Sequence, residues 1–255
     1  MAQRILNPII RFYAELQKLK NTLAIVVAVA VPLFIAFLSF VIYLSEGHKL
    51  IITGINPWKE YIYHLQKFWA GLLLPLTIIL EASLINSIEH SNNMWKQIYT
   101  LPISKSSVYF YKLLSFLFLN MLMAISMTFF VQLFGYLLML FKPEFGFNAP
   151  SFFGESLLLS LKMMLASSAI IGFQFFLSFH FRSFIIPMVI GFCLTIGTGI
   201  ASSWKYILFL PYSYPSLSTS RQDAAVWDLY ITIAVLSLAV LSAAGFYVSS
   251  KREIT

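Results

Sequence analysis

The chain has 255 residues, of which 59% are hydrophobic and 11% are charged, and its formal net charge is +7. A mean hydropathy of +0.82 is more apolar than a soluble core of this length requires, so the composition indicates an integral membrane protein. Lysines and arginines lie at the ends of apolar segments, which favours orientation in a lipid bilayer over nucleic-acid binding.

Residues 1–21 precede the first apolar block and have the pattern of an amphipathic helix. Its apolar stripe comprises Ile5, Ile9, Phe12, Leu16 and Leu19. Its opposite side carries Arg4, Arg11, Glu15 and Lys18. A basic amphipathic helix before a span is typical of an element that lies in the membrane interface. A simple charged flank is the alternative interpretation.

Six apolar segments are long enough to cross a hydrocarbon core of about 30 Å. They are residues 22–44, 69–88, 108–140, 156–179, 184–203 and 229–249. Residues 204–228 open apolar but are interrupted by prolines, which predicts a re-entrant or interfacial external hairpin, with a plain loop as the alternative. The predicted fold class is an all-α integral membrane protein with a single transmembrane domain, residues 1–255.

The distribution of lysine and arginine predicts the orientation of this bundle. Six spans place both termini on one side, together with the loop formed by residues 89–107. That side carries ten lysines and arginines, the opposite side carries six, and Lys162 remains within a span. Because positive residues favour the cytoplasm, we expect both termini and the 89–107 loop to be cytoplasmic.

Residues 89–107 form the longest polar stretch between two strongly apolar blocks. Met94, Ile98 and Leu101 are spaced by four and three residues, which predicts one apolar stripe on a short helix. Trp95 stands beside this stripe, and a proline after its last residue ends the helix. Two interpretations remain open: a surface helix that inserts into a partner protein, and an ordinary solvated loop between spans.

Motifs for catalysis and metal binding are absent from this sequence. It has no G-x-x-x-x-G-K-[ST], so we expect no nucleotide hydrolysis by a P-loop in this chain. It also lacks H-E-x-x-H, paired cysteines and G-x-S-x-G, and its four histidines are scattered without metal-ligand spacing. We therefore expect no catalytic residue, no metal site and no cofactor here.

Two glutamates stand out against this apolar background. Glu81 lies around the middle of the 69–88 span, where an ionised carboxylate is costly unless it is paired or hydrated. It either lines or gates a pathway, or it is hydrogen-bonded to a neighbouring helix or protonated. Glu89 ends the same span and either pairs with Lys96, Arg182 or a partner's basic residue, or is an ordinary interface carboxylate.

A family resemblance rests mainly on the segment between the second and third spans. The residues that carry it are Glu89, Trp95-Lys96, Leu101-Pro102-Ile103-Ser104 and Tyr111-Lys112. With the N-terminal helix and six spans, they resemble the permeases of ABC-2 type transporters. The proline-rich stretch at 209–216 resembles the external segment before the last span of that family. The branch that it resembles is that of lantibiotic-immunity and bacitracin-resistance permeases.

This resemblance implies the permease subunit of an ATP-driven exporter in the bacterial cytoplasmic membrane. A separate ATP-binding cassette ATPase, carrying ATP and Mg, would receive the 89–101 helix as a coupling helix. The implied contact residues are Glu89, Met94, Trp95, Lys96, Ile98 and Leu101. A second permease copy or a sister permease would complete the assembly, and the implied cargo is amphipathic, such as an antimicrobial peptide or a lipid-linked molecule.

Other functional classes remain as alternatives. A secondary transporter or channel needs several intramembrane ionisable groups or broken helices around a site, and Glu81 is its only support in the sequence. An intramembrane enzyme needs a cluster of His, Asp and Glu at one depth, which the sequence does not offer. A regulatory or assembly scaffold also stays open.

Overall fold

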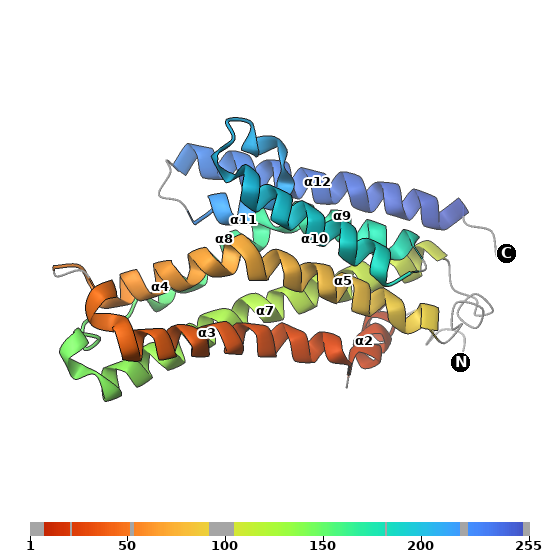
Figure 1. Cartoon of the computed structure of the whole chain (residues 1–255). Coiled ribbons are helices and arrows are strands. Elements are labelled where there is room, and N and C mark those ends of the chain that lie inside the picture. Colours follow the sequence, from red (N-terminus) through yellow and green to blue (C-terminus); the bar gives the residue numbers. More distant parts are fainter. Residues whose placement is uncertain are drawn as a thin grey trace.

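The computed structural model is a bundle of long helices, and it describes residues 8–20, 22–51, 54–91, 105–181, 183–219 and 224–251 (Figure 1). No strand occurs in these ranges, so the predicted all-α class is confirmed. The first helices are α2 (Pro8–Leu19), α3 (Leu23–Leu50), α4 (Pro57–Phe68), the π-helix η1 (Trp69–Leu73) and α5 (Leu74–Ser91). The later long helices are α7 (Lys105–Phe141), α8 (Phe153–Ala166), α9 (Ser168–His180), α10 (Ile185–Ile200) and α12 (Ala224–Lys251).

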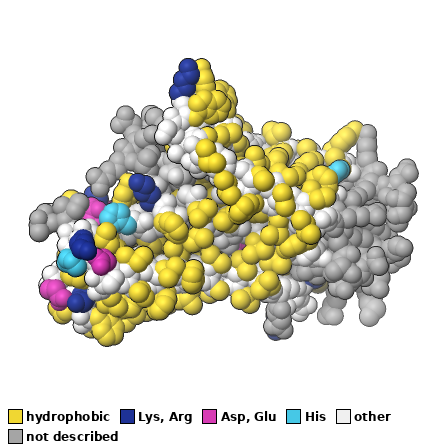
Figure 2. All heavy atoms as spheres, in the orientation of Figure 1, with side chains coloured by type: hydrophobic (Ala, Val, Ile, Leu, Met, Phe, Trp, Pro, Cys, Tyr) yellow, Lys and Arg dark blue, Asp and Glu magenta, His cyan; other side chains and the backbone are white. Residues whose placement is uncertain are grey.

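Five stretches of the described chain are long and apolar enough to cross a membrane. They are Leu23–Leu50, Pro57–Ser87, Ser106–Phe141, Ile185–Ser203 and Leu229–Ser249. The α8–α9 pair makes a sixth candidate if its two bent halves count as one span. On the face drawn in Figure 2, hydrophobic side chains cover the middle of the bundle, and charged ones gather near the α3–α4 and α7–α8 junctions.

The first two candidate spans are longer than the sequence predicted. Helix α3 continues past residue 44 to Leu50, and α4, η1 and α5 form one unbroken run that begins at Pro57 rather than at residue 69. The start of this run is a regular helix N-terminus. Pro57 occupies the first turn, and the Asn56 side chain accepts a hydrogen bond from the Trp58 backbone N–H (3.0 Å).

The fourth predicted span, 156–179, is bent rather than straight. Helices α8 and α9 meet at Ser167 with an angle of 45° between them. The Ser167 hydroxyl donates to the Met163 carbonyl (2.7 Å), one turn earlier in α8. Hydroxyls that bond back to the preceding turn often accompany helix bends.

The segment between α10 and α12 forms short turns rather than a long helix. It contains the 3₁₀ turns η3 (Ala201–Ser203), η4 (Ile207–Phe209) and η5 (Pro211–Ser213), and then the four-residue helix α11 (Tyr214–Leu217). Tyr212 and Tyr214 are buried, whereas Phe209 is 78% exposed. Figures 1 and 2 show the first half of this segment projecting from the side of the bundle. Its re-entrant or interfacial position stays a prediction.

Aromatic side chains hold the α3–α4–α7 end of the bundle together. Trp58 is fully buried, and its indole N–H donates to the Phe147 carbonyl (2.8 Å) after the end of α7. Its ring packs edge-on against Tyr136 and Phe147, with ring centroids 5.0 and 5.4 Å away. Gly135 lies directly opposite this indole, so a larger residue in its place would overlap the ring.

Candidate functional site

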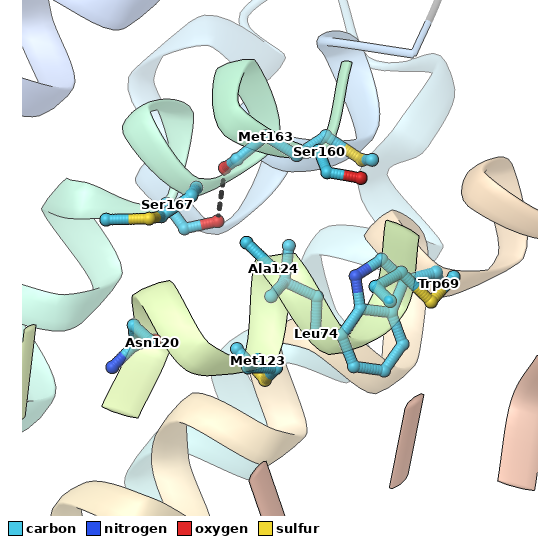
Figure 3. Close-up of a pocket in the computed structure, with 10 residues that line it drawn as sticks. Trp69, Leu74, Asn120, Met123, Ala124, Ser160, Met163 and Ser167 are labelled. Carbon is cyan, nitrogen blue, oxygen red and sulfur yellow. Dashed lines mark hydrogen bonds between the residues drawn. The ribbon is translucent and has the colours of Figure 1, made fainter. Parts of the chain in front are cut away.

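Two irregular stretches of helix meet around one small cavity in the middle of the bundle. One is the π-helical turn η1, and the other is the α8–α9 bend at Ser167. The cavity measures about 10 Å³, roughly the space of a single water molecule. Trp69 of η1 lies on one side of it, and Ser160 and Ser167 from the α8 segment lie on another (Figure 3). Because π-turns are rare and frequently occur at functional sites, this is the candidate site of the bundle.

A hydrogen-bonded group of polar side chains crosses the bundle next to this cavity. Gln66 of α4 donates to the Ser160 hydroxyl of α8 (3.3 Å), and Thr128 of α7 donates to the same hydroxyl (3.0 Å). All three side chains are buried. In a membrane protein such bonds join helices that have no hydrophobic driving force between them, so this group ties α4, α7 and α8 together.

Further buried polar contacts continue this interior along α9. Asn86 of α5 donates to the Ser178 hydroxyl (2.7 Å), and Gln174 donates to the Tyr212 hydroxyl (2.5 Å). Burial raises the pKa of Tyr212 above its usual value, and the hydrogen bond from Gln174 partly offsets that shift. Together with the Gln66–Ser160–Thr128 group, these pairs form what we call the polar seam.

Glu81 lies in α5 and is completely buried. Neither of its carboxylate oxygens has a hydrogen-bond partner within the residues that the structure describes. Since the span containing it is Pro57–Ser87, Glu81 lies near one end of that span rather than at its middle. The predicted hydrogen bond from Glu81 to a neighbouring helix is thus not found among the described residues. The role of Glu81 in lining or gating a pathway stays a prediction.

The predicted coupling residues fall largely beyond the described ranges. Met94, Trp95, Lys96, Ile98 and Leu101 lie outside the described residues. Glu89 belongs to the last turn of α5, but its side chain is not among those described. Their roles therefore stay predictions.

The structure describes the two helices that flank the predicted coupling segment. Their ends show at which end of the bundle this segment is attached. Helix α5 ends at Ser91 and α7 begins at Lys105. Near that start, the Arg11 guanidinium of α2 donates to the Ser107 hydroxyl (2.9 Å). Figure 1 shows α2 and the last turns of α12 at this same end. Lys112, predicted to mark the start of the third span, is only 2% exposed.

The opposite end of the bundle contains a polar contact that sequence analysis missed. The Tyr43 hydroxyl and His64 Nδ1 are 2.9 Å apart, which joins α3 to α4. His64 Nε2 is 3.9 Å from a carboxylate oxygen of Glu60, which is 4% exposed. The spacing of Glu60 and His64 by four residues, after a capping Asn-Pro pair, was the available signal for this face.

Metal binding has no structural support within the described ranges, where no three His, Cys, Asp or Glu side chains come together. Cys193 is a free, exposed cysteine on α10. What distinguishes this interior is thus neutral polar side chains, the buried carboxylate of Glu81, one π-helical turn and one bent span. A π-helical turn of this kind frequently marks a functional site, and the polar contacts join the helices around it.

A family model described as ABC-2 family transporter protein matches residues 11–198. This match covers more than half of the chain and reaches from α2 to the last turn of α10. The chain therefore belongs to the ABC-2 transporter family and is a multi-pass membrane protein. The family supplies the membrane permease component of ABC exporters and generally works with an ATPase subunit. No curated protein and no solved structure matches the chain significantly.

Proposed function

We propose that this chain is the membrane-spanning permease subunit of an ATP-driven exporter in the bacterial cytoplasmic membrane, with both termini inside the cell. The observation that carries the proposal is the family match over residues 11–198, which includes the whole 89–107 segment. The excess of lysine and arginine on the side of the termini supports the orientation.

In this proposal the 89–107 segment couples the bundle to a separate ATP-binding cassette ATPase that binds ATP and Mg. Glu89, Met94, Trp95, Lys96, Ile98 and Leu101 make the contact. Its attachment to α5 and α7 supports this role, because α5 carries Glu81 and half of the Asn86–Ser178 pair while α7 carries Thr128. A displacement of the segment would thus act directly on two helices that form the polar seam.

A second permease copy, or a sister permease, pairs with this chain. Support comes from the candidate spans Ile185–Ser203 and Leu229–Ser249, whose most apolar windows are only 17% and 11% buried within the chain. Their remaining surface is available to lipid and to another permease. Export of an amphipathic cargo, such as an antimicrobial peptide or a lipid-linked molecule, would use the interface between permeases, with Glu81 lining or gating the route.

The coupling role is tested by deleting residues 89–101 and purifying the tagged chain from its native membranes. We expect the intact chain to retain a nucleotide-hydrolysing P-loop ATPase and the deletion variant to lose it. Because apolar anchors dominate small interfaces, Trp95→Ala should weaken retention by about tenfold or more. Trp204→Ala, at a half-exposed tryptophan of the α10–α12 segment, is the matched control and should retain the ATPase fully.

Undiminished ATPase retention by the deletion variant would reject the coupling role. Folding of each variant is checked separately by monodisperse elution in detergent. A variant that aggregates is replaced by the Trp95→Ala and Met94→Ala pair, because these substitutions leave the length of the loop unchanged.

A secondary transporter or channel is the second candidate. The observations that favour it are the buried carboxylate of Glu81 and the bent span formed by α8 and α9, because secondary transporters build sites from broken helices. Transport by the purified chain alone in liposomes, driven by a proton or sodium gradient, would support this candidate. Transport that requires the ATPase and ATP would reject it.

A further inference from the structure

An open groove of about 370 Å³ lies between α4 and α8. Helices α4 and α8 both begin at the α3–α4 end of the bundle and run inward from it (Figure 1). The groove therefore starts at the end of the candidate span Pro57–Ser87 and continues along the two helices. Its lining includes Lys59, Ile62, Glu155, Leu158 and Lys162.

The charged groups of this groove favour an anion at its outer end. Lys59 and Glu155 belong to the first turns of α4 and α8, and Lys162 is two turns further along α8. A lysine about 10 Å deeper in a span reaches back toward the polar boundary with its flexible side chain. Two ammonium groups then share the lining with one carboxylate, which leaves an excess of positive charge.

Apolar side chains continue the groove toward the middle of the bundle. Ile62 forms its floor, and Leu158, which is 53% exposed, forms one edge. Leu165 lies seven residues further along α8, on the same face, and is 43% exposed. The buried Ser156 and Ser160 occupy another face of α8, whereas Leu158 and Leu165 on the groove face are exposed, so the groove opens to the surroundings of the bundle.

We propose that this groove holds one anionic phospholipid of the surrounding bilayer. Lys59 and Lys162 bind the headgroup phosphate, and an acyl chain lies along Leu158 and Leu165. The combination of ammonium groups at the boundary with an apolar track behind them matches both ends of such a lipid. The excess of lysine over glutamate favours an anionic headgroup over a zwitterionic one. This inference concerns the outer surface of the bundle and does not depend on the proposed export function.

Native mass spectrometry of the full chain tests the site, with phosphatidylglycerol and phosphatidylcholine added at equal concentrations to the detergent-purified protein. We expect preferential retention of one phosphatidylglycerol. Each interfacial lysine contributes about fivefold, so Lys59→Gln or Lys162→Gln should lower retention by that factor and the double variant by about thirtyfold. Lys205→Gln, outside the groove on the segment after α10, is the matched control and should change nothing.

A variant that should bind the lipid more tightly controls for misfolding, because a misfolded protein would lose binding instead of gaining it. Glu155→Gln removes the carboxylate from the groove and should raise phosphatidylglycerol retention by about fivefold. Equal retention of the two lipids by the wild type, or unchanged retention by the double lysine variant, would overturn the proposal.

The source of the occupant is settled by extracting the lipid that copurifies from native membranes. A bilayer phospholipid supports a resident lipid. A phosphate-bearing amphiphile of another kind, lost in the Lys59→Gln/Lys162→Gln variant, would overturn it in favour of a bound cargo.

Discussion

The spans at the centre of the bundle and those at its edge are built on different principles. In the most apolar windows of Pro57–Ser87 and Ser106–Phe141, 61% and 56% of residues are buried, against 17% and 11% for Ile185–Ser203 and Leu229–Ser249. The central spans also carry Gln66, Asn86 and Thr128 of the polar seam, whereas the edge spans carry none of its residues and are apolar on nearly every face. Since lipid is as apolar as leucine, hydrogen bonds and close packing must hold the centre together.

The edge spans are attached through a few close contacts. Gly245 of α12 faces the Tyr109 ring of α7, and Gly172 of α9 lies against the backbone of Leu238 in α12. Small residues at these points let the helices approach closely. The difference teaches that an edge span is placed by a narrow line of close contacts, while its remaining surface stays available to lipid or another chain.

The largest effect should come from removing the buried aromatic anchor of the central spans. Trp58→Ala deletes a fully buried indole and leaves the Phe147 carbonyl without its donor. We expect a loss of about 3–5 kcal/mol in unfolding free energy, measured by denaturation in detergent. Trp204→Ala, at a position that is 50% exposed, should change it by less than about 0.5 kcal/mol. Equal losses would show that the two regions do not differ.

A smaller effect should come from blocking the attachment of an edge span. In Gly245→Val, the added side chain would overlap the Tyr109 ring, which itself packs against Phe175 and Phe179. Overpacking of this kind costs about 1–3 kcal/mol. Gly197→Val in α10 is the matched control, because a Cβ there meets nothing within 4 Å. If Gly197→Val destabilised the protein as strongly, helix propensity rather than packing would explain both losses.

The sequence was sufficient to predict the membrane-spanning helices that consist of long apolar runs. Helices as long as α3 and α12 are visible because about twenty consecutive apolar residues have few other stable forms in lipid. The resemblance to ABC-2 permeases was also available, because the family match includes the 89–107 segment on which it rested. The lantibiotic-immunity branch stays a prediction.

The sequence analysis did not predict helix α4, because this helix is buried although its mean hydropathy is low. Glu60 and Gln66 lower the apolar score of this stretch, yet both side chains are buried against neighbouring helices. The bend at Ser167 could not be predicted from the sequence, because no proline or glycine stands at this position. The Tyr43–His64 contact joins two different helices, so the spacing of residues within one helix cannot predict it.

The smallest effect separates a hydrogen bond between helices from one within a helix. The Thr128 hydroxyl of α7 contacts both the Ala124 carbonyl of its own helix (3.2 Å) and the Ser160 hydroxyl of α8 (3.0 Å). The Thr198 hydroxyl of α10 bonds to the Leu194 carbonyl of its own helix (2.8 Å). Thr→Val keeps the shape and removes the hydroxyl at either site. Interhelical bonds in membranes contribute about 0.6 kcal/mol, so Thr128→Val should lower stability by that amount. Thr198→Val should leave stability unchanged, because its loss breaks no contact between helices. Parallel detergent denaturation of both variants resolves the difference, and a loss confined to Thr198→Val would mean that the edge spans, not the seam, depend on polar contacts.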